Sequence, residues 1–358
     1  MKMGSIKDHT SELVLITGAT GHLGFKTLID ALEAGYQVRA AVRSESKAKV
    51  ITSNAAFKAA NIPEGQLNFV IVPDLTVHGA YDEAVKDVQY VIHIASPLTS
   101  GGNLTQDQFK EYFIKPAVQG TVGMLESAAK SPSVRRVVIT SSVVALIPFE
   151  KMLSGSGDYT YTAEDRTPFL DEPYAIEFQA YSAGKTAALN EAEKWMAKTK
   201  PHFDLVHIHP SYIEGRDELV RSKEDAMNGT NGIILRAVTG VKAPFALPGV
   251  TVHNDDVARL HVEALLVDKI PAGSYIANSN TPDGTLNGSQ WETVNEIVAR
   301  NFPETIKEGL FSNDGFQSTV NFNISSEKTE KTFGWKLQGF EAQVKSVVGM
   351  YIDVATKA

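Results

Sequence analysis

Cysteine is absent from the 358 residues of this chain. This absence excludes disulfide bonds, thiolate nucleophiles and cysteine-ligated zinc sites. No apolar run reaches the roughly 18 residues that a membrane-spanning helix needs. The N-terminal stretch MKMGSIKDHTSE is polar and lacks the apolar segment of a signal peptide. We therefore expect a cytoplasmic protein that has no membrane partner and works in a reducing compartment.

Positive charge is also in short supply. The 34 lysines and arginines are outnumbered by 42 acidic residues, which gives a net charge of −8. A nucleic-acid-binding surface should be basic, so no nucleic-acid partner is expected. The content of 43% hydrophobic and 21% charged residues is typical of a globular protein. The length suffices for one large domain or two modest ones.

Short apolar runs alternate with helical patterns through the first 210 residues. This alternation predicts an α/β fold of the Rossmann type, in which a doubly wound parallel sheet is covered on both faces. Strands are expected at 13–18, 36–43, 67–74, 88–96, 135–142 and 203–210. Helices are expected at 22–34, 81–85, 118–129 and 179–198, and residues 44–66 are expected to be irregular.

The alternation of strand and helix patterns ends after residue 210, which suggests that a second region begins there. Residues 11–212 are predicted to form a dinucleotide-binding domain, which a helix and a strand near 252–280 rejoin. Residues 213–251 and 281–358 are predicted to form a smaller C-terminal substrate lobe, with helices near 290–301 and 340–355.

The sequence TGATGHLG follows the first predicted strand directly. Its glycines, Gly18, Gly21 and Gly24, have the spacing G-x-x-G-x-x-G. Glycine permits a tight turn and lets a pyrophosphate approach the backbone, while the helix that begins here directs free N–H groups at the phosphates. The alternative is a tight strand-to-helix turn that binds no ligand.

The end of the second strand distinguishes the two nicotinamide cofactors. An acidic residue there would bind the ribose of NAD, but this chain has Arg43 and, one turn later, Lys47. Two cations suit the 2′-phosphate of NADPH; a solvated basic turn is the alternative, and Glu45 between them leaves NAD open. Asp74, at the end of the third strand, either accepts from the adenine amino group or caps the strand end.

The stretch YSAGK places Tyr181 and Lys185 four residues apart on a predicted helix, and therefore on one face. A neighbouring ammonium would lower the pKa of the phenol, which could then donate a proton to a carbonyl oxygen. Ser141 and Ser142 stand at the end of the fifth strand, where ligands bind in open parallel sheets. Taken alone, a Tyr-x-x-x-Lys spacing also arises by chance on helix surfaces.

Taken jointly and in order, several motifs carry a resemblance over residues 12–350. They are TGATGHLG, Arg43 with Lys47, IASP at 94–97, VVITSS at 137–142, YSAGK and HPSYIEG at 209–215. The chain resembles the extended short-chain dehydrogenase/reductases, most closely the dihydroflavonol reductase-like branch and its fungal NADPH-dependent aldehyde, methylglyoxal and carbonyl reductases. The segments KPAVQGT at 115–121 and RRVVITSSVVALIP at 135–148 are similar to the fungal group.

The resemblance implies reduction of an aldehyde or ketone by NADPH. It implies Tyr181 as the acid, Lys185 as the group that tunes Tyr181 and anchors the ribose, and Ser142 rather than Ser141 as the residue that orients the carbonyl. The candidate cofactor-binding residues, besides Tyr181 and Lys185, are Gly18, Thr20, Gly21, His22, Leu23, Gly24, Arg43, Lys47, Asp74, Leu75, Ile94, Ala95, Ser96, Pro210, Ser211, Tyr212 and Ile213. Candidates for the substrate pocket are Pro97, Phe149, Phe178 and Tyr212.

One residue departs from the family pattern. The position before the lysine is commonly serine, and here it is Gly184. Glycine costs helix stability of about 1 kcal/mol, so we expect the cofactor or a neighbouring helix to pack closely against it.

Other readings of the same residues remain open at this stage. A nucleotide-sugar epimerase or dehydratase could share the fold, although Val143 and Val144 stand where a dehydratase would carry an Asp-Glu pair. A dinucleotide sensor without turnover would typically lack the Tyr-x-x-x-Lys pair. His93, His207 and His209 are interpreted as buried structural histidines and not as a metal site, because no further ligand stands nearby. A monomer or a homodimer is expected.

Overall fold

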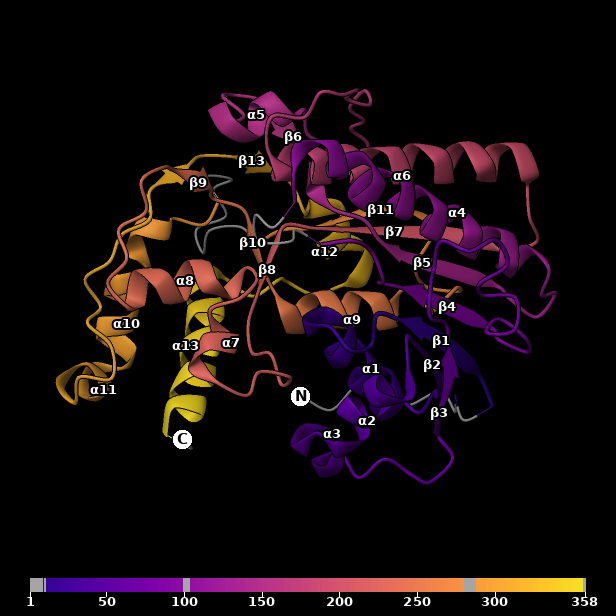
Figure 1. Ribbon diagram of the computed structural model, residues 1–358, viewed down its shortest axis with the longest axis horizontal. Helices are drawn as coiled ribbons and strands as arrows, with labels where there is room; N and C mark the ends of the chain where they lie inside the picture. Colours follow the sequence, from indigo (N-terminus) through magenta and orange to yellow (C-terminus); the bar gives the residue numbers. More distant parts are fainter. Residues whose placement is uncertain (1–8, 10, 99–103, 280–287, 357–358) are drawn as a thin grey trace. The chain divides into compact units, whose positions relative to one another are not determined.

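The computed structural model describes residues 9, 11–98, 104–279 and 288–356. Its largest sheet has seven strands in the order β11-β7-β5-β4-β1-β2-β3 (Figure 1). The strands are β1 (Leu13–Thr17), β2 (Gln37–Val42), β3 (Leu67–Ile71), β4 (Tyr90–His93), β5 (Arg136–Thr140), β7 (Asp204–Pro210) and β11 (Gly273–Ala277). The strands from β3 through β7 pair in parallel. The predicted Rossmann-type α/β fold is confirmed.

Three long helices of this region lie where the apolar spacing predicted them. They are α1 (His22–Glu33), α4 (Lys115–Ala129) and α6 (Glu177–Thr199), and α4 and α6 lie side by side (Figure 1). Apolar side chains from α4, α6 and strands β1, β4 and β5 form one buried cluster, which includes Leu15, Val91, Leu125, Val137 and Ala192.

Two stretches of this region differ from the prediction. Residues 44–66, expected to be irregular, contain α2 (Glu45–Ser53) and α3 (Ala55–Ala59), because the Ser44 and Asn54 side chains cap their first turns. The helix predicted at 81–85 is wrong, because this segment forms a series of turns. Gly79 and Asp87, on either side of it, have φ angles of 74° and 62°, so a right-handed helix could not extend beyond this short segment.

The remaining elements lie mostly in the second half of the chain, and all but α13 are short. The structure has the 3₁₀ helices η1 (Gln106–Gln108), η3 (Val143–Ala145) and η4 (Trp291–Thr293), and the π-helix η2 (Lys110–Ile114). The other α-helices are α5 (Phe149–Ser154), α7 (Lys223–Ala226), α8 (Asn231–Val238), α9 (Asn254–Glu263), α10 (Val294–Asn301), α11 (Pro303–Lys307), α12 (Glu327–Phe333) and α13 (Phe340–Thr356). Three two-stranded sheets join β8 (Tyr212–Glu214) to β10 (Thr251–His253), β9 (Leu247–Pro248) to β12 (Thr319–Val320), and β6 (Thr160–Tyr161) to β13 (Asn323–Ile324).

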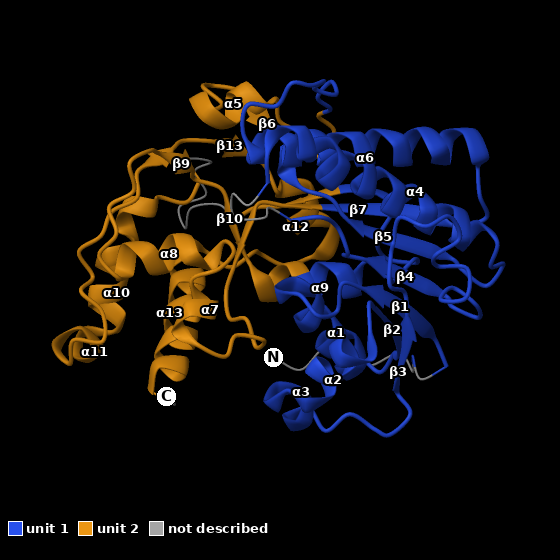
Figure 2. Cartoon of the chain, viewed as in Figure 1, with its two compact units in different colours: residues 1–145, 166–208, 258–274 blue, residues 146–165, 209–257, 275–358 orange. Residues whose placement is uncertain are grey.

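The chain divides into two compact units (Figure 2). Unit 1 comprises residues 1–145, 166–208 and 258–274, and unit 2 comprises residues 146–165, 209–257 and 275–358. Residues 146–165, which lie inside the predicted 11–212 domain, thus group with unit 2. Unit 2 has its own buried apolar cluster, which includes Ile234, Trp291, Val298 and Val347.

None of the helices that the structure describes combines the length and the apolar character needed to cross a membrane.

Candidate active site

The glycine loop after β1 is folded so tightly that larger residues do not fit. A Cβ atom on Gly24 would lie 2.0 Å from the carbonyl oxygen of Gly18. Gly18 has a φ angle of 77°, and a Cβ there would lie 2.9 Å from the amide nitrogen of Ala95. Gly21 caps α1 without a side-chain hydrogen bond. The loop thus offers a bare backbone at a helix N-terminus, which fits the pyrophosphate of a dinucleotide.

Thr20, His22 and Leu23 belong to the same turn and the first turn of α1. Leu23 is buried, whereas Thr20 and His22 are half-buried.

The basic pair after β2 is free to meet a ligand. Arg43 and Lys47 are exposed at the start of α2, where the hydroxyl of Ser44 accepts the amide hydrogen of Lys47. Asp74 is also exposed and uses Oδ1 to accept from the backbone and hydroxyl of Thr76, at 2.8 and 2.6 Å. The capping role of Asp74 is therefore seen, and its contact with adenine stays a prediction. Leu75 packs against Gly120 of α4.

Thr17, the last residue of β1, fixes the loop that follows β4. Its Oγ accepts the backbone N–H groups of Ile94 and Ala95, both at 3.1 Å, and lies 3.0 Å from Nδ1 of His93. These two residues and Ser96 are the predicted cofactor-lining segment. Sequence reasoning overlooked Thr17, because a threonine at a strand end is common and its partners lie 76 to 78 residues away.

The three predicted catalytic side chains lie close together, with Ser142 just after the carboxyl end of β5 and with Tyr181 and Lys185 on α6. Tyr181 and Ser142 share a side-chain hydrogen bond. Lys185 Nζ lies 5.8 Å from the centre of the Tyr181 ring and donates to Ser96 Oγ at 3.1 Å. Ser141 continues the strand pairing by donating its backbone N–H to Ile208. The structure thus places Ser142, and not Ser141, beside the phenol.

Apolar side chains surround Tyr181 and affect its pKa. Its ring stacks on Phe178 at 6.2 Å between centroids and meets the edge of Phe113 at 6.4 Å. Burial in this apolar cluster raises the pKa of Tyr181 to about 12, and the hydrogen bond from Ser142 opposes the effect only in part. Burial therefore outweighs the opposing effects in this structure, and the lowering of the Tyr181 pKa by Lys185 stays a prediction. Burial also lowers the pKa of Lys185, to about 8, so both groups are protonated at neutral pH.

Gly184 has the close neighbour that the sequence suggested. A Cβ at this position would lie 2.9 Å from the carbonyl oxygen of Phe113. Phe113 belongs to the π-helix η2, whose five residues pack against α6. A π-helical turn beside a site is a common device for placing side chains, and nothing in the local sequence signalled it. The glycine is therefore what allows Phe113 to reach Tyr181.

The remaining residues predicted to contact the substrate or the nicotinamide belong to both units. Pro97 and Phe178 are half-buried in unit 1, whereas Phe149 begins α5 and Tyr212 begins β8 in unit 2. Pro210 ends β7, Ser211 donates its backbone N–H to Ala277, and Ile213 pairs with Val252. Their proposed contacts with substrate and nicotinamide stay predictions.

The histidines interpreted as structural are buried, with exposures of 2% for His93, 4% for His207 and 0% for His209. Within the described ranges, no three His, Asp or Glu side chains are grouped so that they could hold a metal ion.

Comparison with known proteins identifies the family. A family model described as the NAD dependent epimerase/dehydratase family matches residues 14–272. The chain belongs to this family. The prediction of an extended short-chain dehydrogenase/reductase is therefore confirmed.

Curated relatives and a solved structure match the chain over nearly its full length. A ketoreductase of Cercospora nicotianae is 42% identical over 352 residues, which is 96% of each chain. Aldehyde reductase 2 of Sporidiobolus salmonicolor is 30% identical over 349 residues, which cover 94% of this chain and 95% of the relative. The yeast methylglyoxal/isovaleraldehyde reductase, solved with NADPH, has a TM-score of 0.79 at 21% identity and covers 97% of this chain and 100% of its own. This last likeness concerns the fold.

Proposed function

We propose that the protein reduces an aldehyde or a ketone to an alcohol with NADPH. The observation that carries the proposal is the group of Ser142, Tyr181 and Lys185, held at the same edge of the sheet as the glycine loop. The relatives named as a ketoreductase and an aldehyde reductase, and the yeast reductase solved with NADPH, support it. Unit 2 is proposed to contribute the substrate lobe.

Bound NADPH would supply the hydride that adds to the carbonyl carbon. The phenol of Tyr181 donates its proton to the carbonyl oxygen as negative charge develops there. Because burial holds the pKa of Tyr181 at about 12, the phenol is protonated at neutral pH. It is still a far stronger acid than an alcohol, so the proton transfer runs toward product. Ser142 hydrogen-bonds the same oxygen, and the ammonium of Lys185 stabilises the phenolate that forms.

The exposed and backbone groups on unit 1 fit the cofactor. The loop from Gly18 to Gly24 would hold the pyrophosphate, and Arg43 with Lys47 would bind the 2′-phosphate. Asp74 and Leu75 lie next along the sheet edge for adenine, and residues 94–96 would line the nicotinamide side. Lys185 would bind the ribose hydroxyls.

The substitution Tyr181→Phe tests the proposed acid. Phenylalanine keeps the ring packed between Phe113 and Phe178 but has no proton to give. We expect kcat for a panel of small aldehydes, ketones and diketones to fall by about 10²–10⁴-fold, while fluorescence should show that NADPH still binds. Undiminished turnover would refute the role of Tyr181. Tightly held NAD, together with no NADPH oxidation across the panel, would instead support the epimerase alternative.

The substitution Arg43→Ala tests the cofactor assignment. Loss of a charge-assisted contact to the 2′-phosphate should raise the KM for NADPH by about 10- to 100-fold. The KM for NADH should change little, since NADH lacks that phosphate. Steady-state kinetics with both cofactors decide the point, and equal changes would contradict the assignment.

A further inference from the structure

The hydrogen bonds of Thr17 determine which nitrogen of His93 carries the hydrogen. A threonine hydroxyl has one proton and two lone pairs. The backbone N–H groups of Ile94 and Ala95 occupy both lone pairs of Thr17 Oγ. The proton of that hydroxyl is therefore left for Nδ1 of His93, at 3.0 Å. Nδ1 is then the acceptor, and Nε2 carries the hydrogen.

This Nε2–H group is a buried donor. His93 is 2% exposed, and its Nε2 has no hydrogen-bond partner within the part of the chain that the structure describes. The rings of Tyr81 and His93 meet edge to face, with 5.7 Å between their centroids. A buried donor left without an acceptor is costly, and native proteins usually satisfy such a group with an ordered water molecule.

A small cavity in unit 1 brings His93 together with Lys185. It has a volume of about 10 Å³, which is close to the smallest that holds one water molecule. Its polar walls include His93, Lys185, Ser96, Thr121 and Ser141, and Tyr181 is not among the lining residues. A site of this size with several convergent polar groups meets the conditions for an internal water molecule.

We propose that this cavity binds one water molecule, which accepts hydrogen bonds from Nε2 of His93 and from the ammonium of Lys185. The hydroxyl groups of Ser96, Thr121 and Ser141 are available as its acceptors. One N–H of Lys185 then donates to Ser96 and a second to the water, so the third is left for the cofactor. This last step, binding of the cofactor by Lys185, rests on the proposed function. His93 is thus a positioning residue, which acts on Lys185 through the water.

The proposed water stabilises the charged form of Lys185. Burial already lowers the pKa of Lys185 to about 8, and a lost acceptor would lower it further. The other titratable groups around the cavity do not change their protonation state near that pH. Burial lowers the pKa of His93 to about 3 and of His207 to about 4, and it raises those of Tyr81 and Tyr181. A transition near pH 8 therefore reports Lys185.

The variants His93→Leu and His93→Gln test the proposal as a pair. Leucine removes the donor, whereas the glutamine amide can restore an N–H close to the position of Nε2. We expect His93→Leu to move the Lys185 transition down by on the order of one pH unit and His93→Gln to keep it near the wild-type value. The transition is followed in protein with ¹³Cε-labelled lysine, and Lys185→Met identifies its signal. This measurement needs no turnover, so it still stands if the enzyme reduces no carbonyl compound in the panel.

Two further readouts keep the test decisive if His93→Leu fails to fold. The ¹⁵N spectrum of histidine-labelled wild-type protein should show the Nε2–H tautomer for His93, and a high-resolution crystal structure should show a water within hydrogen-bond distance of Nε2 and of Lys185 Nζ. In active protein, His93→Leu should lower kcat and shift its pH profile with little change in the carbonyl KM. An Nδ1–H tautomer, an empty cavity, or equal shifts in both variants would overturn the proposal.

Discussion

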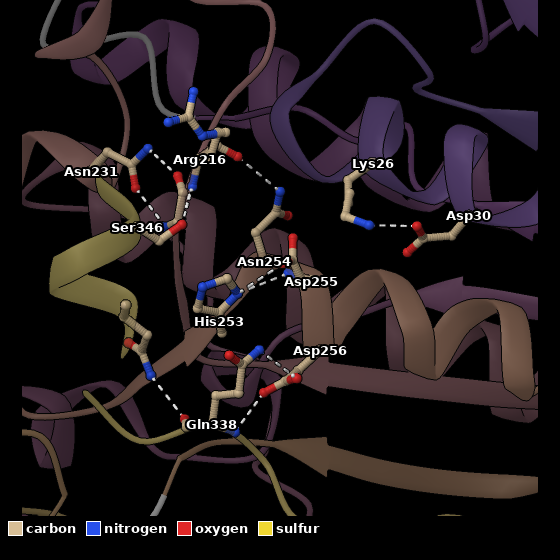
Figure 3. A network of polar contacts seen from close by, with 12 residues as sticks. Lys26, Asp30, Arg216, Asn231, His253, Asn254, Asp255, Asp256, Gln338 and Ser346 are labelled. Atoms are coloured by element: carbon tan, nitrogen blue, oxygen red, sulfur yellow. Dashed lines mark hydrogen bonds and ion pairs between the residues drawn. The ribbon is translucent and has the colours of Figure 1, made fainter. Parts of the chain in front are cut away.

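Both units bury ionisable groups, but they treat them differently. In unit 2, Asp256 on α9 is satisfied, because Gln338 donates to it through its backbone and its side chain at 2.6 and 3.0 Å (Figure 3). In unit 1, Lys185 is buried and Tyr181 is half-buried, and each has a hydrogen-bond partner, Ser96 and Ser142 respectively. Loss of water displaces the pKa of all three groups, and only that of Asp256 is opposed by two hydrogen bonds from one residue. The contacts of Asp256 with Gln338 hold two segments of unit 2 together, whereas Lys185 and Tyr181 of unit 1 carry protons that the proposed reaction can use.

Glu214 is the exception in unit 2. It ends β8, is 0% exposed, and both carboxylate oxygens lack a hydrogen-bond partner among the described residues. Burial raises its pKa well above the usual value, with Arg236 opposing the effect. Its neighbour across the two-stranded sheet is His253, the paired residue on β10. The same cause, loss of water, therefore favours the neutral form of Glu214 in unit 2 and destabilises the charged form of Lys185 in unit 1.

The largest expected effect comes from Lys185→Met, which should separate activity from stability. Loss of the ammonium should lower kcat/KM by about 10²–10⁴-fold. The same change should stabilise the protein at pH 7 by up to about 3 kcal/mol, because the folded wild type carries a lysine pKa near 8 against 10.5 when unfolded.

The stabilisation of the protein by Lys185→Met should depend on pH. Between pH 8 and 10.5 the unfolded wild type binds more protons than the folded protein, so wild-type stability rises with pH in this window. The advantage of Lys185→Met should therefore be full below pH 8 and shrink as the pH approaches 10.5. Urea unfolding at several pH values measures it, and a gain that does not depend on pH would contradict this account.

The sequence predicts the strands and the grouping of the candidate catalytic side chains where the evidence lies in a short stretch of residues. Alternating apolar runs predicted the strands, and YSAGK with a strand-end serine predicted the side chains that the structure brings together. The helix predicted at 81–85 is wrong, because the positive φ angles of Gly79 and Asp87 on either side of it are not visible in the apolar spacing. The burial that raises the pKa of Tyr181 could not be predicted from the sequence, because its apolar neighbour Phe113 comes from a π-helix 68 residues earlier in the chain.

A matched pair of glycines tests how closely that π-helix packs. In Gly184→Ala the new methyl group would lie 2.9 Å from the Phe113 carbonyl oxygen, so we expect a loss of about 1–3 kcal/mol in unfolding free energy. The control is Gly123→Ala in α4, where a Cβ would meet nothing within 4 Å. That substitution should stabilise the protein by about 0.5–1 kcal/mol. Similar effects in both variants would show that α6 has room at Gly184.

The substitution Glu214→Gln should change the free energy of unfolding least at low pH. Its stabilising effect should grow as the pH rises, whereas that of Lys185→Met should shrink. Above the ordinary glutamate pKa of 4.5 the unfolded wild type ionises while the folded protein keeps its proton, so wild-type stability falls as the pH rises. Glutamine has a similar shape and does not ionise. The variant should therefore match the wild type near pH 4 and gain on it steadily toward pH 7 in thermal or urea unfolding.

Glu304→Gln is the control for this last measurement, because the Glu304 side chain of α11 is 72% exposed and forms an ion pair with Lys307, which is also exposed. An exposed pair of this kind contributes little to stability, so its replacement should leave the pH dependence of unfolding nearly unchanged. If Glu214→Gln behaved like this control, Glu214 would have to be ionised inside unit 2. The contrast between a neutral acid there and a buried cation in unit 1 would then fail.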